Sequence, residues 1–200
     1  MRSRLFALLF LLMAATGLPG AAFAGEVDDA LRTFNARVLE VMKAGPKLGF
    51  KGRLDKFRAI VSDSYDITAI TKAMLGPSAV KQLGDDMVKV SESYTTFSAA
   101  TYAAQFGDWD GERFEVGESR PSTGGSLIVQ SWIIPKTGDP TQIDYVMRQG
   151  QGRWRIIDVL FDGTVSQVAV RRSEFGSIYR AKGLTGLLET IEKQTAALEK

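Results

Sequence analysis

Cysteine and histidine are both absent from the 200-residue sequence. Without histidine the chain lacks the most common general base and metal ligand, and it cannot form a Ser-His or Cys-His nucleophile pair. Without cysteine it has no disulfide, and a metal site would have to consist of carboxylates alone. The sequence also contains no G-x-S-x-G, P-loop or G-x-G-x-x-G motif. We therefore expect no catalytic residue, no metal ion and no cofactor.

An excess of positive charge is also absent once the first residues are set aside. The sequence has 25 basic and 23 acidic residues, and Arg2 and Arg4 account for the difference. Proteins that bind nucleic acid depend on basic side chains that neutralise phosphates. We expect a nearly neutral chain of this kind not to bind nucleic acid.

Residues 1–24 have the pattern of a Sec-type signal peptide. A start with two arginines is followed by the apolar run LFALLFLLMAATGL and by small residues at Ala22 and Ala24. This order predicts cleavage after Ala24, and an uncleaved N-terminal anchor is the alternative. No later apolar run is long enough to span a bilayer. We therefore expect a soluble periplasmic protein with one domain over residues 25–200.

The first half of this domain shows the spacing of helices. Apolar residues recur every three or four positions in four stretches, over 27–41, 50–61, 67–74 and 87–101. Gly45-Pro46 is predicted to end the first helix. Asp66 is a suitable N-cap for the third helix, and Gly76-Pro77 should stop it. Asp85 and Asp86 should open the fourth, because acids suit the positive end of a helix dipole.

In the second half of the domain, the spacing of apolar residues changes from that of helices to that of strands. Four β-rich segments are separated by turn-rich residues: RFEVGES, SLIVQSWIIP, QIDYVMRQ and RWRIIDVLFD. Strands with such short connections form an antiparallel meander. Helices are expected again from Val165 onward, with a last helix that includes Leu184 and Leu198. The fold class is therefore α+β, with a curved four-stranded antiparallel sheet packed against several helices.

One face of this sheet and one helix stripe have a surplus of large apolar side chains. Strand parity places Ile133, Met147, Val159 and Phe161 on the same face. The helix over 87–101 and its continuation carry three aromatic residues among alanines and serines: Tyr94, Phe97 and Tyr102. Large rings beside small residues can enclose a cavity, but the same pattern is typical of a packed core. The pattern alone leaves both interpretations open.

Asp158 is an acid within the apolar run of the last strand. In an apolar pocket its pKa would rise, which suits the general base of an isomerase or hydratase. The structural interpretation is a pair with Arg148 or Arg155, or backbone N–H groups bound near the end of the strand. Asp108 and Asp110 form a second acidic pair, for which a surface loop is the favoured interpretation.

Four segments together are similar to those of a known family: YDITAITKAMLG, TYAAQF before GERFEV, IDYVMRQGQGRWRIIDVLFDGTVSQ and RRSEFGSIYRAKGLTGLLETI. They resemble the MlaC, or toluene-tolerance, family of periplasmic phospholipid carriers. The most specific of them contains a W-x-x-x-D-V-x-x-x-G-x-S pattern, which spans residues 154–166. Within the family, LGFKGR and VSQVAVRRSEF are most similar to the hopanoid-associated member HpnM.

The resemblance implies an NTF2-like fold with a lipid cavity between sheet and helices, and no catalysis. It implies a carrier that moves a hopanoid or a phospholipid between an inner-membrane transporter complex of the ABC type and an outer-membrane complex. We expect the carrier to be a monomer. We expect seven residues to line the cavity: Tyr94, Phe97, Tyr102, Ile133, Met147, Val159 and Phe161. The alternatives are an NTF2-like isomerase or hydratase with Asp158 as base, and an adaptor with a solid core.

A group of basic residues lies near the C-terminal end of the chain: Arg171, Arg172, Arg180 and Lys182. These side chains could contact a lipid phosphate or an acidic partner surface. The favoured interpretation is a helix face exposed to solvent.

Overall fold

The computed structural model describes residues 19–199, and side chains from residue 25 onward. Residues 1–18 of the expected signal peptide lie outside this part of the chain. The helices are α1 (Pro19–Ser64), α2 (Ile67–Leu75), α3 (Pro77–Leu83), α4 (Met87–Gln105) and α5 (Gln167–Ala196), with short 3-10 turns at Gly84–Asp86 and Thr123–Gly125. Within residues 19–199, none of the helices combines the length and the apolar character needed to cross a bilayer.

A single antiparallel sheet follows the helices α1–α4 along the chain. Its strands are β1 (Arg113–Pro121), β2 (Ser126–Ile134), β3 (Thr141–Gly150), β4 (Arg153–Phe161) and β5 (Val165–Ser166), in the spatial order β1-β2-β3-β4-β5. The meander predicted from the sequence is confirmed. The fifth strand was not predicted, since Val165 pairs with Phe161 of β4 instead of starting the last helix.

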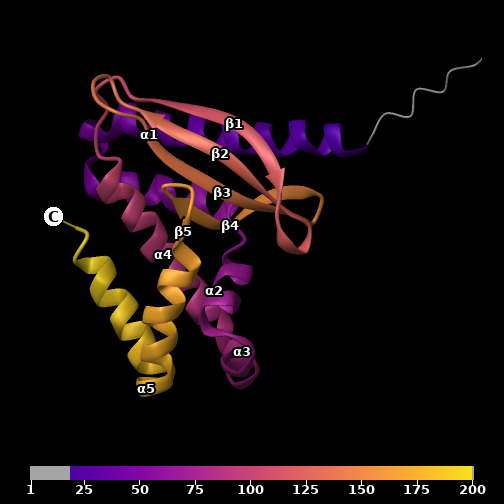
Figure 1. Ribbon diagram of the computed structural model, residues 1–200. Helices are drawn as coiled ribbons and strands as arrows, with labels where there is room; N and C mark the ends of the chain where they lie inside the picture. Colours follow the sequence, from indigo (N-terminus) through magenta and orange to yellow (C-terminus); the bar gives the residue numbers. More distant parts are fainter. Residues whose placement is uncertain (1–18, 200) are drawn as a thin grey trace, which may run out of the picture.

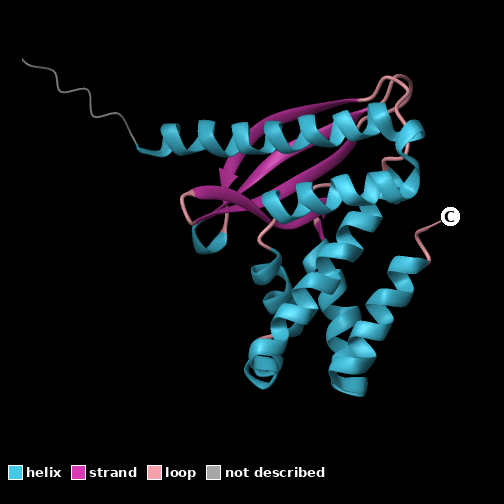
Figure 2. Cartoon of the chain, turned by 180° about the vertical axis from the view of Figure 1, so that it is seen from behind, coloured by secondary structure: helices cyan, strands magenta, loops and turns pink. Residues whose placement is uncertain are grey.

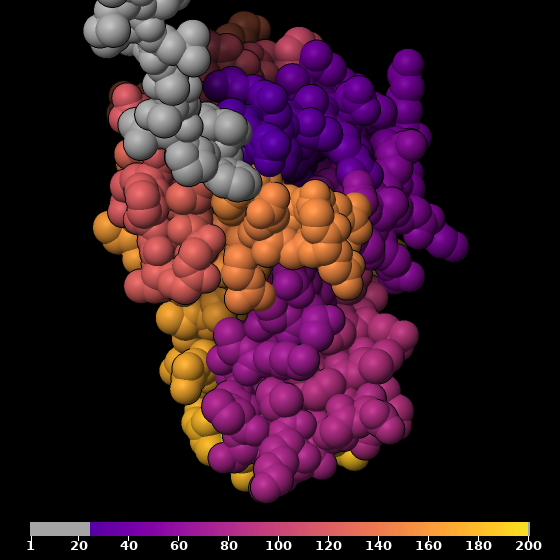
Figure 3. Space-filling model, turned by 90° about the vertical axis from the view of Figure 1, so that its right-hand side faces the viewer, coloured from indigo at the N-terminus to yellow at the C-terminus, as the bar shows by residue number. Residues whose placement is uncertain are grey.

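The helices divide into two groups around this sheet (Figures 1 and 2). The helix α1 crosses one face of the sheet and contacts β1, β2 and β4. The helices α2, α3, α4 and α5 form a second group that extends away from the sheet, with α4 in contact with α1, α2 and α5. From the side, the end of the β3–β4 hairpin sits above α2 and α3, and the end of the β1–β2 hairpin lies beside it (Figure 3).

The long helix α1 bends back on itself at Gly49, which has φ 61° and ψ 177°. The break predicted at Gly45-Pro46 is wrong, because the helix continues through Pro46. Glycine is required at position 45 because of a close contact: a Cβ atom there would lie 2.1 Å from the carbonyl oxygen of Gly107. Glycine at this position therefore lets α1 approach the chain that follows α4. Arg53 reinforces this contact with hydrogen bonds to the carbonyl oxygens of Ala103 (2.9 Å) and Gly45 (3.2 Å).

Two irregularities change which side chains face the helices. The register shifts between Val116 and Ser119 of β1, and again where Met147 pairs with Ile156 while Val146 pairs with Asp158. The second shift leaves β4 with an extra residue. Ile156 is consequently fully buried, and the simple alternation that groups Ile157 with Val159 fails at this bulge.

Candidate functional site

A cavity lies between the end of the sheet at β3 and β4 and the helices α4 and α5. Its volume is about 110 Å³, and the hollow holds about 660 Å³ when it is counted out to open solvent at the mouth. Its lining residues come from four elements (α4, β3, β4 and α5), from the α1–α2 connection and from the residue after α4: Tyr65, Tyr94, Phe97, Ser98, Thr101, Tyr102, Gln105, Phe106, Ile143, Tyr145, Val159, Phe161, Gln167 and Arg171. The site is thus built where the helix group meets the open face of the sheet.

The walls of this cavity are mainly aromatic and aliphatic. Arg171 is the one charged residue among those lining it. Other hollows are larger but their walls carry several charges. The hollow of about 460 Å³ between α1 and the β3–β4 hairpin, for example, is lined by Glu26, Asp29, Arg37, Asp63 and Arg153 among others. The chemistry of the walls, not the size of the hollow, makes the first cavity the candidate for an apolar ligand.

Five of the seven residues expected at the cavity line it: Tyr94, Phe97, Tyr102, Val159 and Phe161. They come from two elements, α4 and β4, whose stripes face each other across the hollow. Phe161 is also 39% exposed, so its ring forms part of the mouth. The structure therefore brings the predicted aromatic helix face and the end of β4 to one site.

The other two expected residues, Ile133 and Met147, do not line this cavity. Met147 is only 2% exposed, lies opposite Ile156 and lines the charged hollow beside α1. Ile133 is in β2, between Phe114 of β1 and Thr141 of β3. Strand parity identifies the face on which a side chain lies, but not which helix covers it. The helix α1 covers the part of the sheet that includes β2, whereas the cavity lies over β3 and β4 only.

Several lining residues were not predicted as site residues. Ile143 and Tyr145 share the face of Val159, so cross-strand pairing would have identified them. Tyr65 belongs to the connection between α1 and α2, and no periodic pattern points to it. Arg171 was interpreted as part of a face exposed to solvent, but its side chain is only 25% exposed.

Three tyrosines, Tyr65, Tyr102 and Tyr145, form a polar cluster within the aromatic walls. The hydroxyl oxygens of Tyr65 and Tyr102 are 2.6 Å apart, and the ring of Phe34 makes edge contacts with all three tyrosines. Burial raises the pKa of each of the three phenols well above its ordinary value. The hydroxyl groups therefore stay protonated at neutral pH and act as hydrogen-bond donors.

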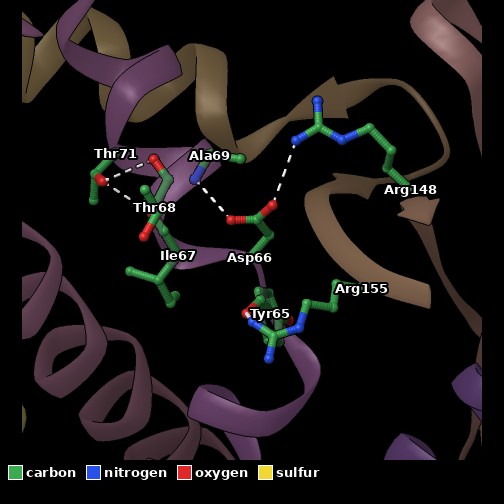
Figure 4. Close-up of polar contacts among 8 residues, drawn as sticks. All are labelled: Tyr65, Asp66, Ile67, Thr68, Ala69, Thr71, Arg148 and Arg155. Carbon is green, nitrogen blue, oxygen red and sulfur yellow. Dashed lines mark hydrogen bonds and ion pairs between the residues drawn. The ribbon is translucent and has the colours of Figure 1, made fainter. Parts of the chain in front are cut away.

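Polar contacts around Asp66 fix the position of Tyr65 (Figure 4). The carboxylate of Asp66 accepts a hydrogen bond from the backbone N–H of Ala69 at 2.9 Å, which caps α2 as predicted, and it pairs with Arg148 of β3 at 3.4 Å. The N–H of Asp66 donates to the carbonyl oxygen of Ile156 at 2.9 Å. These bonds hold the α1–α2 connection against the sheet and direct the Tyr65 ring into the cavity.

The family profile described as MlaC protein matches residues 32–193. The chain belongs to the MlaC family. Among solved structures, it is similar to the phospholipid-binding protein from Ralstonia solanacearum, which was determined in complex with a phospholipid. The two chains are 18% identical, the match covers 88% of this chain and 99% of the other, and the TM-score is 0.73. This likeness confirms the α+β fold with helices packed on a curved sheet.

In this member of the MlaC family, Asp158 connects β4 to α5. Its carboxylate accepts hydrogen bonds from the backbone N–H groups of Val159 (2.7 Å) and Val168 (3.0 Å) and from the hydroxyl of Ser166. The predicted pair with Arg148 or Arg155 is not formed, because Arg148 binds Asp66 and Arg155 reaches the carbonyl oxygen of Tyr65. Of the two structural interpretations, backbone N–H binding is confirmed. Asp158 does not line the cavity.

The second acidic pair lies away from the cavity. Asp110 is in the connection between α4 and β1 and pairs with Lys136 at 3.4 Å, with both side chains exposed. Within residues 19–199, no group of three acidic side chains is arranged to hold a metal ion. The arrangement of Asp108 and Asp110 is that of a polar surface loop.

Proposed function

We propose that the protein is a carrier that binds one membrane lipid, with the hydrocarbon part of the lipid in the cavity between β3, β4, α4 and α5. The observation that carries this proposal is the aromatic cavity that opens to solvent at Phe161. Membership of the MlaC family supports it, as does the phospholipid found with the structurally similar protein from Ralstonia solanacearum. No chemical step is part of this function.

The hydrophobic effect is sufficient to hold a lipid in such a site. Burying about 500 Å² of apolar ligand surface contributes about 12 kcal/mol before the costs of ordering are subtracted. A lipid in a bilayer is already out of water, so its transfer from membrane to carrier changes the free energy far less. A small net change suits a carrier that must both load and release its ligand.

The cavity must widen before it can hold a lipid tail. Pockets that bury ligands of ordinary drug size measure roughly 300–1,000 Å³, and the volume here is about 110 Å³. Phe161 has room to move, since its side chain is 39% exposed. We therefore propose that lining side chains move apart to widen the cavity when a lipid enters.

The expected signal peptide places this activity in the periplasm after cleavage following Ala24. A monomer that receives lipid from an inner-membrane transporter complex and exchanges it with an outer-membrane complex would fit the function of the family that the sequence resembles. Phospholipids and hopanoids are the two ligand classes we consider, the latter because of the similarity to HpnM. The cavity walls by themselves accept the hydrocarbon of either class.

Lipid that co-purifies with the protein tests this proposal. The mature protein is isolated from its native host and extracted with organic solvent, and the extract is analysed by mass spectrometry. A Ser98→Trp variant, which fills the cavity from α4, is purified in parallel with Val88→Trp, whose site on the same helix is 59% exposed. We expect near-stoichiometric lipid in the wild type and in Val88→Trp, and much less in Ser98→Trp. Equal amounts in all three, or none in the wild type, would contradict the carrier function.

The alternative of an isomerase or hydratase receives no support from the site. Its base would be Asp158, but both oxygens of this carboxylate already accept hydrogen bonds at the start of α5. A carboxylate so engaged, and outside the cavity lining, is not placed to remove a proton from a ligand there.

A further inference from the structure

A cluster of buried hydroxyl groups interrupts the apolar wall of the cavity. It is formed by Tyr65, Tyr102 and Tyr145, which come from the α1–α2 connection, α4 and β3 and all line the hollow. Tyr65 is 6% exposed and Tyr145 is 4% exposed, whereas Phe161 at the mouth is an exposed residue. The cluster therefore belongs to the inner part of the cavity and not to its mouth.

The hydroxyl groups of this cluster carry one hydrogen more than they can share among themselves. The oxygens of Tyr65 and Tyr102 are 2.6 Å apart, and the hydroxyl of Tyr145 is the other hydrogen-bonding neighbour of Tyr102. Three hydroxyl groups in a row form at most two hydrogen bonds with one another, and each carries one hydrogen. Within residues 25–199, no backbone carbonyl or further side chain accepts a hydrogen bond from them. At least one O–H donor is therefore left without an acceptor.

Phe34 closes the side of the cluster that faces away from the cavity. Its ring makes edge contacts with all three tyrosine rings, it is buried, and it does not line the hollow. The cavity is thus the open space into which the unused donor can point. Thr101 in the same wall differs, because its hydroxyl already donates to the carbonyl oxygen of Phe97 at 2.9 Å. The tyrosine cluster is what offers a ligand a hydrogen bond from the inner wall.

A plain hydrocarbon chain cannot use this donor. Such a chain has no lone pair, so when it packs against the cluster it buries the O–H group unsatisfied, which lowers the affinity. A hydroxyl or keto oxygen on the chain accepts the hydrogen bond and removes this loss. Burial raises the pKa values of the three phenols, so the donor persists at neutral pH.

We propose that Tyr65, Tyr102 and Tyr145 bind an oxygen atom carried by the hydrocarbon part of the lipid, so that the carrier prefers lipids with a hydroxyl or keto group there over unsubstituted ones. This inference rests on the proposed function and adds a specificity-determining contact inside the same cavity. Ester carbonyl oxygens lie next to the headgroup and stay nearer the mouth. The oxygen that the cluster binds is therefore one farther along the chain.

A series of phosphatidylcholines that differ only in one acyl chain tests the inference. The chain is either unsubstituted or carries a single keto group, which is only an acceptor, at successive positions. Vesicles with equal amounts of the plain lipid and one keto lipid are incubated with delipidated protein, and mass spectrometry measures the lipids bound to the re-isolated protein. We expect the wild type to enrich the keto lipid by about fivefold, as one neutral hydrogen bond provides, with a maximum at an inner chain position.

Phenylalanine variants locate the donor. The triple variant Tyr65→Phe/Tyr102→Phe/Tyr145→Phe keeps the three rings and removes every hydroxyl of the cluster, so it should bind keto and plain lipids alike. Tyr179→Phe is the matched control, because the hydroxyl of Tyr179 contacts Gln82 and the residue does not line the cavity. This variant should keep the enrichment of the wild type.

An infrared measurement on the wild type does not depend on the folding of the triple variant. A keto lipid with an isotope label at its ketone is bound to the protein, and its carbonyl band is compared with that of the same lipid in dry hydrocarbon solvent. We expect the band of the bound lipid at lower wavenumber, because a hydrogen bond weakens the C=O bond. A residue that acts only in folding would not shift this band.

The possible outcomes separate this inference from the proposed function. No enrichment of any keto lipid by the wild type, the same enrichment in a folded triple variant, or an unshifted infrared band would overturn the tyrosine contact and leave the carrier function intact. An enrichment that only rises towards the headgroup would also overturn it, because water at the mouth would then be the donor. Failure of the wild type to take up either lipid would instead contradict the proposed function itself.

Discussion

The carboxylate of Asp158 in β4 accepts a hydrogen bond from the hydroxyl of Ser166, and Ser166 in turn caps α5 by accepting one from the N–H of Ala169. The same carboxylate binds the N–H of Val168. Two orphan donors at the start of α5 are thus satisfied by one strand residue and one cap residue. Because α5 carries Arg171 and Gln167, this connection sets the position of one wall of the cavity.

Replacing Asp158 should therefore reveal a structural role. Asp158→Ala removes the acceptor for three donors and should lower the free energy of unfolding by about 2–3 kcal/mol. Asp158→Asn keeps an oxygen for the backbone N–H groups and an amide for Ser166, so it should cost about 1 kcal/mol or less. Urea denaturation measures both.

Lipid content gives the control for these variants. If Asp158 were a general base, Asp158→Ala and Asp158→Asn would abolish its function to the same extent. If Asp158 is structural, the two variants should lose stability, and with it bound lipid, to different extents. If Asp158→Asn were as stable as the wild type but failed to bind lipid, the structural account of this carboxylate would be wrong.

Met147 and Val159 should respond differently to truncation. Met147→Ala deletes a side chain buried under α1 and should cost about 2–5 kcal/mol of stability with little change in lipid stoichiometry. Val159→Ala enlarges a site that already opens to solvent, so it should cost less stability and alter the lipids retained. Thermal unfolding and lipid extraction, applied to both variants, check this contrast. Loss of bound lipid in a folded Met147→Ala protein would show that the cavity extends under α1.

The buried tyrosines predict a loss of stability at alkaline pH. Burial raises the pKa values of Tyr65, Tyr102 and Tyr145 in the folded protein, while the unfolded chain ionises its tyrosines near pH 10. Above about pH 10 the unfolded state therefore loses protons that the folded state keeps, and the free energy of unfolding falls. Denaturation followed by phenolate absorbance measures this effect.

The tyrosine variants provide the comparison. Replacing Tyr65 and Tyr145 by phenylalanine should make the decrease in stability above about pH 10 less steep. A decrease of the same steepness in the double variant would assign the alkaline effect to other groups.

Gly45 should tolerate no side chain. Gly45→Ala places a Cβ atom against the carbonyl group of Gly107, so α1 and the end of α4 must move apart, at a cost of about 1–3 kcal/mol. Gly150→Ala is the matched control, because a Cβ atom there meets no atom within 4 Å. Urea denaturation of the two variants should show a lower midpoint for Gly45→Ala only. Equal midpoints would show that this helix contact is not tightly packed.

The sequence predicts regular elements well where local chemistry decides them. Asp66 and Gly76-Pro77 bound α2 as expected, and the four main strands follow their apolar alternation. Prediction from the sequence fails where a contact between distant segments determines the local structure. The approach of Gly107 explains Gly45, and the bulge beside Ile156 reverses the expected faces only in the part of β4 that precedes it.

The cavity was predictable only in part for the same reason. Helix phase identified Tyr94, Phe97 and Tyr102, and the end of β4 supplied Val159 and Phe161. Neither period nor parity shows that α1 covers Met147 while α4 and α5 leave space over Tyr145. The position of Arg171 also depends on how Asp158 and Ser166 set the start of α5, which is a tertiary contact.

Photo-crosslinking of a lipid with a diazirine at the end of an acyl chain tests the central claim most directly. After loading and irradiation, peptide mapping shows which residues the chain touches. The account predicts labels on α4 and β4 around Phe97 and Val159, and on Tyr145 of β3. Labels confined to the hollow beside Trp154 and Arg153, or to the exposed helix surfaces, would contradict a lipid site between the sheet and the helices α4 and α5.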